Sequence, residues 1–437
     1  MRQDPDYRRS RAGHGAAAPA PRMASDPAPR GSFRLLVDPV FGPFFVGKLL
    51  STAGIWVHNI VAAIMAFELS GSAFVVGLVS VMQFGPQLVL APLSGAMADR
   101  GDRRRQVILG RLIAASGSGG LALWIALVGV DGLPGAWPVV ATALVVGIGF
   151  VVGGPAMNAM IPALVRPGEL ATAVALNSVP FTIARAGGPA VGAVVAASAG
   201  PATAFAIAAL TNLLFVALLW PLSFRSRAEG GGKGDMRVRA GLAHVRRDPG
   251  IVLLLVGVAA IGLGADPVIT LTPSVAAGFG AGSELVGVLA SSFGVGAGLA
   301  FVVLSVLRRH LGLPRLGTLG LVLLALGTGA AGVSPTPALA VAAFVVGGIG
   351  LTMSLTSLST QLQERVPDAL RGRVMALWSV AFLGSRPISA ATNGAVADAW
   401  SPATAFLGVA ALVLVAALWT RPGRLAARPA PAATSGG

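Results

Sequence analysis

The sequence contains no cysteine in 437 residues. Disulfide bonds, thiol nucleophiles and thiolate metal sites are therefore excluded. Charged residues are also scarce, at 11% of the chain, and hydrophobic residues make up 54%, whereas soluble domains carry about 25% charged residues. A chain with so little charge and so many apolar residues is predicted to be an integral membrane protein.

The chain also lacks the motifs of membrane enzymes and ATP-driven pumps. No G-x-x-x-x-G-K-[ST] phosphate-binding loop occurs, since the GGGKG run at 230–234 is followed by Asp235. No cluster of His, Asp and Glu has the spacing of metal ligands. We therefore expect no enzyme activity, no cofactor and no metal. A carrier-like sensor or scaffold is disfavoured, because the tails offer only short segments for an interaction domain.

The formal net charge of +15 would suit a nucleic-acid partner. Its distribution argues against one, because Lys and Arg gather in the tails and in alternate linkers between apolar runs. This asymmetry is typical of membrane helices whose basic linkers lie in the cytoplasm. We expect a multi-pass protein of the bacterial inner membrane with both termini in the cytoplasm and no nucleic-acid partner.

Twelve apolar runs are long enough to cross the hydrocarbon core of ~30 Å, which takes about 20 helical residues. The expected fold is therefore all-α, with twelve transmembrane helices in two six-helix halves. The predicted spans are 42–67, 74–98, 107–129, 136–160, 173–198, 201–221, 250–275, 284–307, 315–333, 337–361, 373–396 and 402–420.

The domain organisation follows from the polar segments. The halves are predicted at 33–222 and 249–421, with a cytoplasmic linker at 223–248. Residues 1–32 and 422–437 are predicted to be disordered cytoplasmic tails. Met23 is an alternative start of translation, and no cleavable signal peptide is visible.

An internal repeat supports this division into pseudo-symmetric halves. Shifted by 201 residues, Val140–Ala209 aligns without a gap on Val341–Ala410. The pentapeptide PATAF is repeated, and Arg185 falls on Arg386. Spans 4–6 are thus predicted to recur as spans 10–12 in the same orientation, as in carriers built from two parallel halves.

The linker between the second and third spans reads GAMADRGDRRRQ. Its pattern G-x-x-x-D-R-x-x-R-R resembles the signature loop of the major facilitator superfamily, with Met97 and Asp102 as departures from the usual residues. The run VPDALRGR at 366–373 resembles a segment of the macrolide-efflux and enterobactin-exporter branch. The resemblance implies the major facilitator fold and a gate formed by Gly95, Asp99, Arg100, Arg103, Arg104, Arg371 and Arg373.

The gate has a physical basis. Gly95 would let a helix end approach a neighbour closely. Asp99 would be held by arginines in one conformation and released in another. The alternative is an ordinary basic loop without a switching role.

The fifth span carries Gly188, Pro189 and Gly192, which resemble the antiporter motif of that superfamily. Glycine and proline permit close packing and a kink, as a rocking helix requires, and tight packing alone is the other interpretation. Arg185 and Arg386 lie within spans. They are predicted either to bind an anionic group or polarise a nearby carboxylate, or to bond backbone carbonyls where the halves meet.

Ionisable groups within spans are costly and mark candidate coupling sites. Asp266 is either an outer-end cap or a carboxyl group that is protonated in one state only. Lys48 is near the cytoplasmic end, where its side chain can snorkel, and Glu68 is near the outer end, where it can be solvated. The remaining candidates are His58 and Asn59 for coupling and Gln83, Gln87, Asn158, Asn177, Asn212 and Gln361 for lining a cavity.

These features predict a monomeric secondary transporter whose partners are a small-molecule substrate, protons and the lipid bilayer. The resemblance implies export of a hydrophobic or amphiphilic compound by proton antiport through alternating access. An importer of a small nutrient on the same fold is the alternative. It is disfavoured for sugars, because aromatic and carboxylate residues are sparse within the spans.

Overall fold

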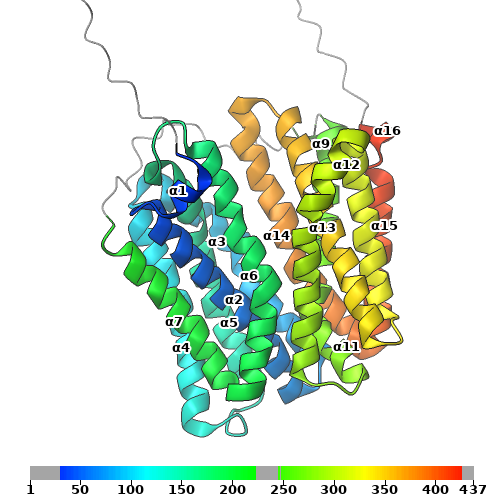
Figure 1. Ribbon diagram of the computed structural model, residues 1–437. Coiled ribbons are helices and arrows are strands. Elements are labelled where there is room, and N and C mark those ends of the chain that lie inside the picture. Colours follow the sequence, from blue (N-terminus) through cyan, green and yellow to red (C-terminus); the bar gives the residue numbers. More distant parts are fainter. Residues whose placement is uncertain (1–29, 223–244, 247, 426–437) are drawn as a thin grey trace, which may run out of the picture.

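The computed structural model describes residues 30–222, 245–246 and 248–425, apart from the side chains of 368, 369 and 371–373. Every regular element in these ranges is helical (Figure 1). The elements are α1 (Ser32–Leu36), α2 (Phe41–Ser70), α3 (Ala73–Arg100), α4 (Arg103–Val128), α5 (Trp137–Ala159), the 3₁₀ turn η1 (Ile161–Leu164), α6 (Leu170–Ala199), α7 (Pro201–Leu219), α9 (Pro249–Ala265), α10 (Pro267–Thr270), α11 (Thr272–Gly278), α12 (Ser283–Gly332), α13 (Pro337–Arg365), α14 (Asp368–Ala399), α15 (Pro402–Trp419) and α16 (Pro422–Leu425).

Eleven helical segments of the described chain are long and apolar enough to cross a bilayer. One of them, α12, has 50 residues and breaks at Gly312, whose φ of 70° lies in the left-handed region that glycine tolerates and a helix does not. The break divides α12 into 283–311 and 313–332, so the eleven segments supply twelve crossings. The predicted all-α membrane fold is confirmed.

The seventh predicted span, 250–275, is not one continuous helix. It is interrupted between α9 and α10 at Asp266 and between α10 and α11 at Leu271. The cause of the first interruption is Pro267, which has no N–H to donate and whose ring obstructs a continuous helix. Asp266 therefore lies at a break within the protein interior.

The helices form two bundles that stand side by side (Figure 1). The first bundle is α2–α7 and the second bundle is α9–α15. Helices α7 and α15 begin at Pro201 and Pro402, which is the shift of the predicted repeat. Helices α1 and α16 lie at the same end of the molecule, the upper end in Figure 1, which we name the terminal end. The opposite end is the far end.

Two helix pairs join the bundles, α3 with α14 and α6 with α12, and both are packed through glycine. A Cβ atom on Gly77 of α3 would lie 2.4 Å from the carbonyl oxygen of Ala390, and one on Gly294 of α12 would lie 2.4 Å from that of Arg185. Only residues without a side chain permit helices to approach so closely. The side chains at mid-depth between the bundles, which are described below, come mainly from these four helices.

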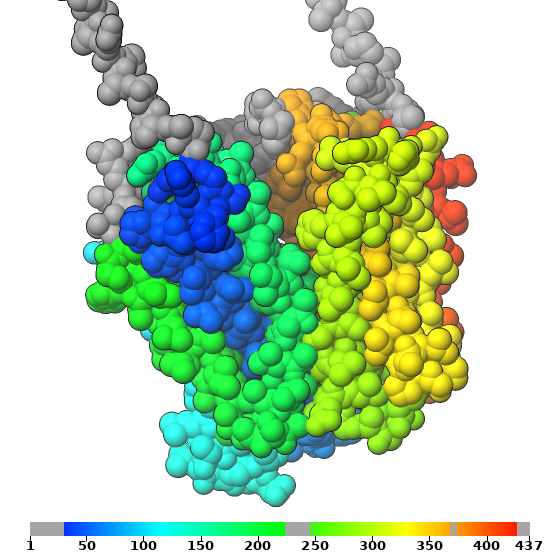
Figure 2. Space-filling view, viewed as in Figure 1, coloured from blue at the N-terminus to red at the C-terminus, as the bar shows by residue number. Residues whose placement is uncertain are grey.

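A carboxylate joins the two bundles at the far end. Asp398, in the last turn of α14, accepts hydrogen bonds from the Ser72 hydroxyl and from the N–H groups of Ala73 and Phe74 at the start of α3, at 2.5, 2.7 and 3.1 Å. The second bundle thus caps a helix N-terminus of the first, where an anion is favoured. Toward the terminal end the surface is hollowed between α6 and α12 (Figure 2).

Replacing this cap should open the far end. Asp398→Ala removes an N-cap interaction, which contributes about 0.5–2 kcal/mol. Its loss should raise the population with the bundles apart at the far end, relative to the population with them joined, by roughly 2- to 30-fold. Double electron–electron resonance between spin labels at the exposed residues Asp131 and Glu284 would report it as longer distances. Because the native chain has no cysteine, two introduced cysteines suffice. Asp398→Asn keeps one acceptor and should shift the distances less, and unchanged distributions in both variants would show that the cap does not hold the bundles together.

Candidate functional site

Arg185 lies midway along α6, between aromatic rings of both bundles. Its guanidinium carbon is 5.6 Å from the ring centre of Trp56 on α2 and 5.0 Å from that of Phe293 on α12. Trp56 in turn packs edge-on against Phe181, with ring centres 6.0 Å apart. A cation over an aromatic face is attracted by the ring quadrupole. Arg185 therefore links the bundles through rings, and the described part of the chain gives it no ion-pair partner.

Arg386 repeats this arrangement from the other side. It lies on α14, and its guanidinium carbon is 4.2 Å from the ring centre of Phe84 on α3. Phe84 and Phe293 occupy similar depths, 11 and 10 residues after the starts of α3 and α12. Each arginine of the repeat thus stacks on a phenylalanine of the opposite bundle. Arg386 is 8% exposed and its Nε has no hydrogen-bond partner among the described residues.

Asp266 is fully buried near Arg386, and the two charges interact electrostatically. Its Oδ2 accepts hydrogen bonds from the Thr270 hydroxyl at 2.9 Å and from the Asn393 amide at 3.3 Å. Its Oδ1 has no partner in the described part of the chain. The interpretation of Asp266 as a water-exposed outer-end cap is therefore wrong. Among the described membrane-spanning segments it is the one buried carboxylate.

The polar residues of α2 bond within the first bundle. The side-chain oxygen Oδ1 of Asn59 accepts a hydrogen bond from the side-chain amide of Gln83 at 2.5 Å, and both residues are buried. His58 contacts the Ser118 hydroxyl through Nδ1 at 3.1 Å and packs edge-on against Phe205. The Nε2 atom of His58 has no partner among the described residues. The sequence-predicted pair His58-Asn59 is thus buried, with its two members facing different helices.

Lys48 is buried and does not snorkel to the surface. Its ammonium group donates to the backbone and side-chain oxygens of Asn177, and the Asn177 amide donates to Asn158 at 3.4 Å. Asn158 is exposed, so a chain of polar groups runs from the surface to Lys48.

A further buried cation, Arg111 on α4, was missed by the sequence analysis. Its guanidinium contacts Asn212 at 3.5 Å and lies over the ring of Phe215. It lies six residues after Arg105, the last arginine of the basic loop, and was not singled out from the sequence. The signal that would have identified it is its position within the span 107–129.

Three predicted residues lie away from these clusters. Glu68 is exposed in the last turn of α2, in agreement with its solvated alternative. Gln361 donates to the carbonyl oxygens of Leu313 and Ser357 and bonds within the second bundle. Gln87 is half-buried.

The glycines of the fifth-span motif pack within the first bundle. A Cβ atom on Gly188 would lie 2.6 Å from Cβ of Trp56, and one on Gly192 would lie 2.7 Å from Ile60. The neighbouring Pro189 faces the second bundle, since a Cβ atom on Gly287 of α12 would lie 3.2 Å from the Pro189 carbonyl oxygen. The motif therefore holds α6 against α2 while the other side of α6 meets the second bundle.

The predicted gate makes contacts inside the first bundle only, as far as the described residues show. Arg103 donates to the carbonyl oxygens of Ala98 and Ala159, and Arg104 donates to that of Trp220. Asp99 and Arg100 are exposed. The close approach expected at Gly95 is absent, since no described atom lies within 4 Å of its Cβ position. The side chains of Arg371 and Arg373 lie outside the described residues.

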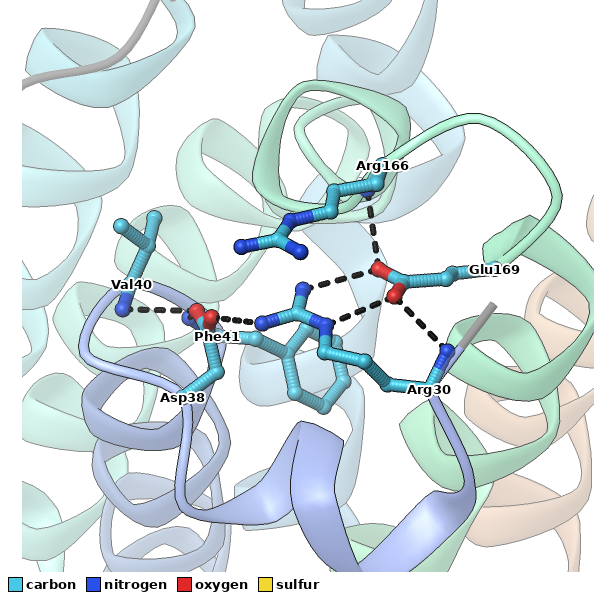
Figure 3. Close-up of polar contacts among 6 residues, drawn as sticks. All are labelled: Arg30, Asp38, Val40, Phe41, Arg166 and Glu169. Atoms are coloured by element: carbon cyan, nitrogen blue, oxygen red, sulfur yellow. Dashed lines mark hydrogen bonds and ion pairs between the residues drawn. The ribbon is translucent and has the colours of Figure 1, made fainter. Parts of the chain in front are cut away.

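An ion-pair cluster at the terminal end was also not predicted (Figure 3). Arg30 donates to Glu169 through Nε at 2.6 Å and Nη2 at 2.8 Å, and pairs with Asp38. Asp38 also accepts the N–H groups of Val40 and Phe41 at the start of α2. Arg30 and the start of α1 at Ser32 thus belong to the described structure although they fall within the predicted tail 1–32, and α16 falls within the predicted tail 422–437. Because 139 residues separate Arg30 from Glu169, no local pattern indicated the pair.

This cluster makes stability depend on acid pH. The side-chain hydrogen bonds from Arg30, which outweigh the opposing effect of burial, lower the pKa of Glu169 to about 2 from 4.5. A lowered pKa stabilises the fold fully above pH 4.5, and the contribution is lost as the pH falls toward 2. Glu169→Gln should therefore lower stability by about 1–3 kcal/mol at neutral pH and flatten the pH dependence. Thermal unfolding of purified protein would measure both effects, with the exposed Glu284→Gln as control. An unchanged melting temperature would contradict the structural role of the cluster.

Comparisons with known proteins place this geometry among transporters. A family model described as transmembrane secretion effector matches residues 30–434. The nucleoside transporter NupG aligns with a TM-score of 0.70 at 14% identity, covering 88% of this chain and 99% of that one. A D-xylose–proton symporter aligns with a TM-score of 0.68 at 15% identity, covering 88% of this chain and 97% of that one. A bacterial homologue of the iron transporter ferroportin, in an inward-facing state, aligns with a TM-score of 0.68 at 15% identity, covering 90% of this chain and 100% of that one. At such identities the likeness shows the fold alone. No curated protein matches.

Proposed function

The chain belongs to the transmembrane secretion effector family of the major facilitator superfamily, and we propose that it exports a hydrophobic or amphiphilic small molecule by proton antiport. The transported class includes drugs, antibiotics, siderophores and secondary metabolites. The branch assignment rests on the resemblance of the loop at 95–105 and of the run at 366–373 to macrolide and enterobactin exporters.

One observation carries the proposal. The bundles are joined at the far end by Asp398 and at mid-depth by repeat-related arginines on aromatic rings, while the surface is hollowed toward the terminal end. A mid-depth site reached from one end is what alternating access requires of each of its two states. The contacts of α3 with α14 and of α6 with α12 would loosen at the far end as the terminal end closes.

The proposed orientation has the terminal end in the cytoplasm of a bacterium, and it is supported by the basic linkers of the sequence. The hollow then opens inward, and Arg103 and Arg104 of the loop donate hydrogen bonds to carbonyl oxygens of the first bundle in this state. In the alternate state Asp99 and the arginines of the loop would close the cytoplasmic side. The protein is proposed to act as a monomer, since each bundle supplies half of one central site.

Asp266 is the proposed coupling group. It is a buried carboxylate with one oxygen unpartnered among the described residues and with Arg386 in electrostatic range. Such a group can carry a proton in one state and release it in the other when its surroundings change. A single buried carboxylate also disfavours the alternative, an importer of a sugar-like nutrient, because hydroxylated substrates need several polar partners.

The test is accumulation of a panel of amphiphilic fluorescent compounds in efflux-deficient cells, with and without this protein. We expect lower accumulation in cells that carry the protein, reversed by a protonophore. Expression-matched cells carrying Asp266→Asn provide the control for membrane load. Higher accumulation in the presence of the protein would favour the importer, and equal accumulation across the panel would contradict export of this substrate class.

A further inference from the structure

The described membrane spans carry an excess of positive charge in their interior. Lys48, Arg111 and Arg386 are at most 8% exposed, and Arg185 is half-buried between two rings. Against these four cations stands the carboxylate of Asp266. Buried charges without partners are costly and are retained in membrane helices mainly where they serve a function.

The two central arginines are well placed to receive an anion. The guanidinium carbon of Arg185 lies 5.0 Å from the ring centre of Phe293, and that of Arg386 lies 4.2 Å from the ring centre of Phe84. A ring face attracts the cation but offers no oxygen atom to which a guanidinium N–H group could donate. Among the described residues, the Nε of Arg386 has no hydrogen-bond partner and no carboxylate is within ion-pair distance of Arg185. The two like charges also act on one another. A ligand oxyanion between them would relieve this repulsion and accept charge-assisted hydrogen bonds.

We propose that Arg185 and Arg386 form a binding site for the acidic group of an anionic amphiphile, a carboxylate, sulfonate or phosphate attached to an apolar body. The rings of Trp56, Phe84 and Phe293 that hold the arginines contact the apolar body beside the acidic group. This assignment rests on the proposed function, since it identifies the class of molecule that is transported.

The first bundle supplies a second cation on the way to this site. Asn177 precedes Arg185 by eight residues on α6, which is about 12 Å along a helix. Lys48 bonds to Asn177, and Asn177 bonds to the exposed Asn158. An acidic group entering from the terminal end meets Lys48 before it reaches Arg185. The cations are thus arranged along one route from the terminal end to mid-depth.

Binding can be measured without transport. Pyrene-1-butyrate, its methyl ester and a pyrenebutyl trimethylammonium ion share one apolar body and differ in charge. Each is titrated by fluorescence against the full chain in phosphatidylcholine nanodiscs, with empty discs as blank. We expect the carboxylate to bind roughly tenfold or more tightly than the ester, and the cation to bind weakest, because one charge-assisted pair distinguishes them.

Variants assign the preference to the arginines. Arg185→Gln and Arg386→Gln should each weaken carboxylate binding about 10- to 100-fold and leave ester binding unchanged, whereas Arg386→Lys keeps the charge and should lose less. Arg308→Gln removes an exposed cation at the terminal end and should change neither. Equal binding of acid and ester, no binding of the acid, or an acid preference that survives both glutamine variants would overturn the proposal.

Two further arms separate the related conclusions. Discs that contain phosphatidylglycerol test whether a lipid headgroup is the occupant. If this lipid weakens binding of the pyrene carboxylate to the native protein but not to Arg386→Gln, the occupant is a lipid. If the lipid does not weaken binding, the occupant is a soluble amphiphile. Proton-driven uptake of the probe into inverted vesicles tests the proposed function. Binding that depends on the arginines but is not followed by uptake would support the anion site and contradict export. Uptake of the ester in preference to the acid would support export and contradict the anion site.

Discussion

Asp266→Asn should abolish proton-driven transport and leave the protein folded. The substitution is nearly isosteric and keeps an oxygen that can accept the hydrogen bonds from Thr270 and Asn393. It removes the one buried carboxylate of the described spans, and an amide does not exchange protons in the physiological range. Without a group that binds and releases protons, the proton gradient has no means of driving the substrate uphill.

Two assays in reconstituted vesicles separate coupling from binding. Transport driven by an imposed pH gradient should vanish in Asp266→Asn, whereas exchange of labelled for unlabelled substrate at equal pH should continue. Asp131→Asn, which removes an exposed loop carboxylate, should behave as wild type in both. Gradient-driven transport at the wild-type rate in Asp266→Asn would exclude Asp266 as the coupling group.

Gly294→Ala should impair transport severely, because it adds a methyl group where α12 touches the backbone of α6. The new Cβ would lie 2.4 Å from the Arg185 carbonyl oxygen and 2.5 and 2.7 Å from backbone atoms of Ala186. Backbone atoms of a packed helix cannot turn aside as a side chain does, so α12 and α6 must separate. Overpacking of this kind costs about 1–3 kcal/mol. The population of the state in which the bundles are joined at the far end should therefore fall by a factor of about 5 to 150 relative to the alternate state.

Gly298 provides the matched control. It lies one turn further along the same helix, and the nearest atom to its Cβ would be the Thr182 methyl group at 3.9 Å. Both substitutions raise helix propensity equally, so only the contact with α6 differs. Gly294→Ala should slow exchange and lengthen the distance between labels at Asp131 and Glu284, and Gly298→Ala should do neither. Similar behaviour of the two variants would show that the close approach of α6 and α12 is not required.

The fold followed from the sequence because membrane insertion depends on composition over about 20 residues, which is a local property. The predicted span boundaries differ from the helix ends by a few residues. Two interruptions of the seventh span were missed, at Asp266 and at Leu271, and the first of them occurs next to Pro267, which the sequence displays. The repeat marked Arg185 and Arg386 as equivalent before any contact was known. The predictions for Lys48 and Gly95 were less accurate, because each depended on a neighbour from another helix.

The sequence by itself determined that this chain is a twelve-span membrane protein with an internal repeat, since hydropathy and self-similarity need no knowledge of contacts. Only the tertiary structure decided which rings hold the two arginines, that Asp266 is buried near Arg386, and that Arg111 belongs to the interior. It also brought Arg30 to Glu169 and Asp398 to the start of α3, each across more than a hundred residues. The physical reason is that side-chain partners in a helical membrane protein come from helix packing, which the apolar pattern of each span specifies only weakly.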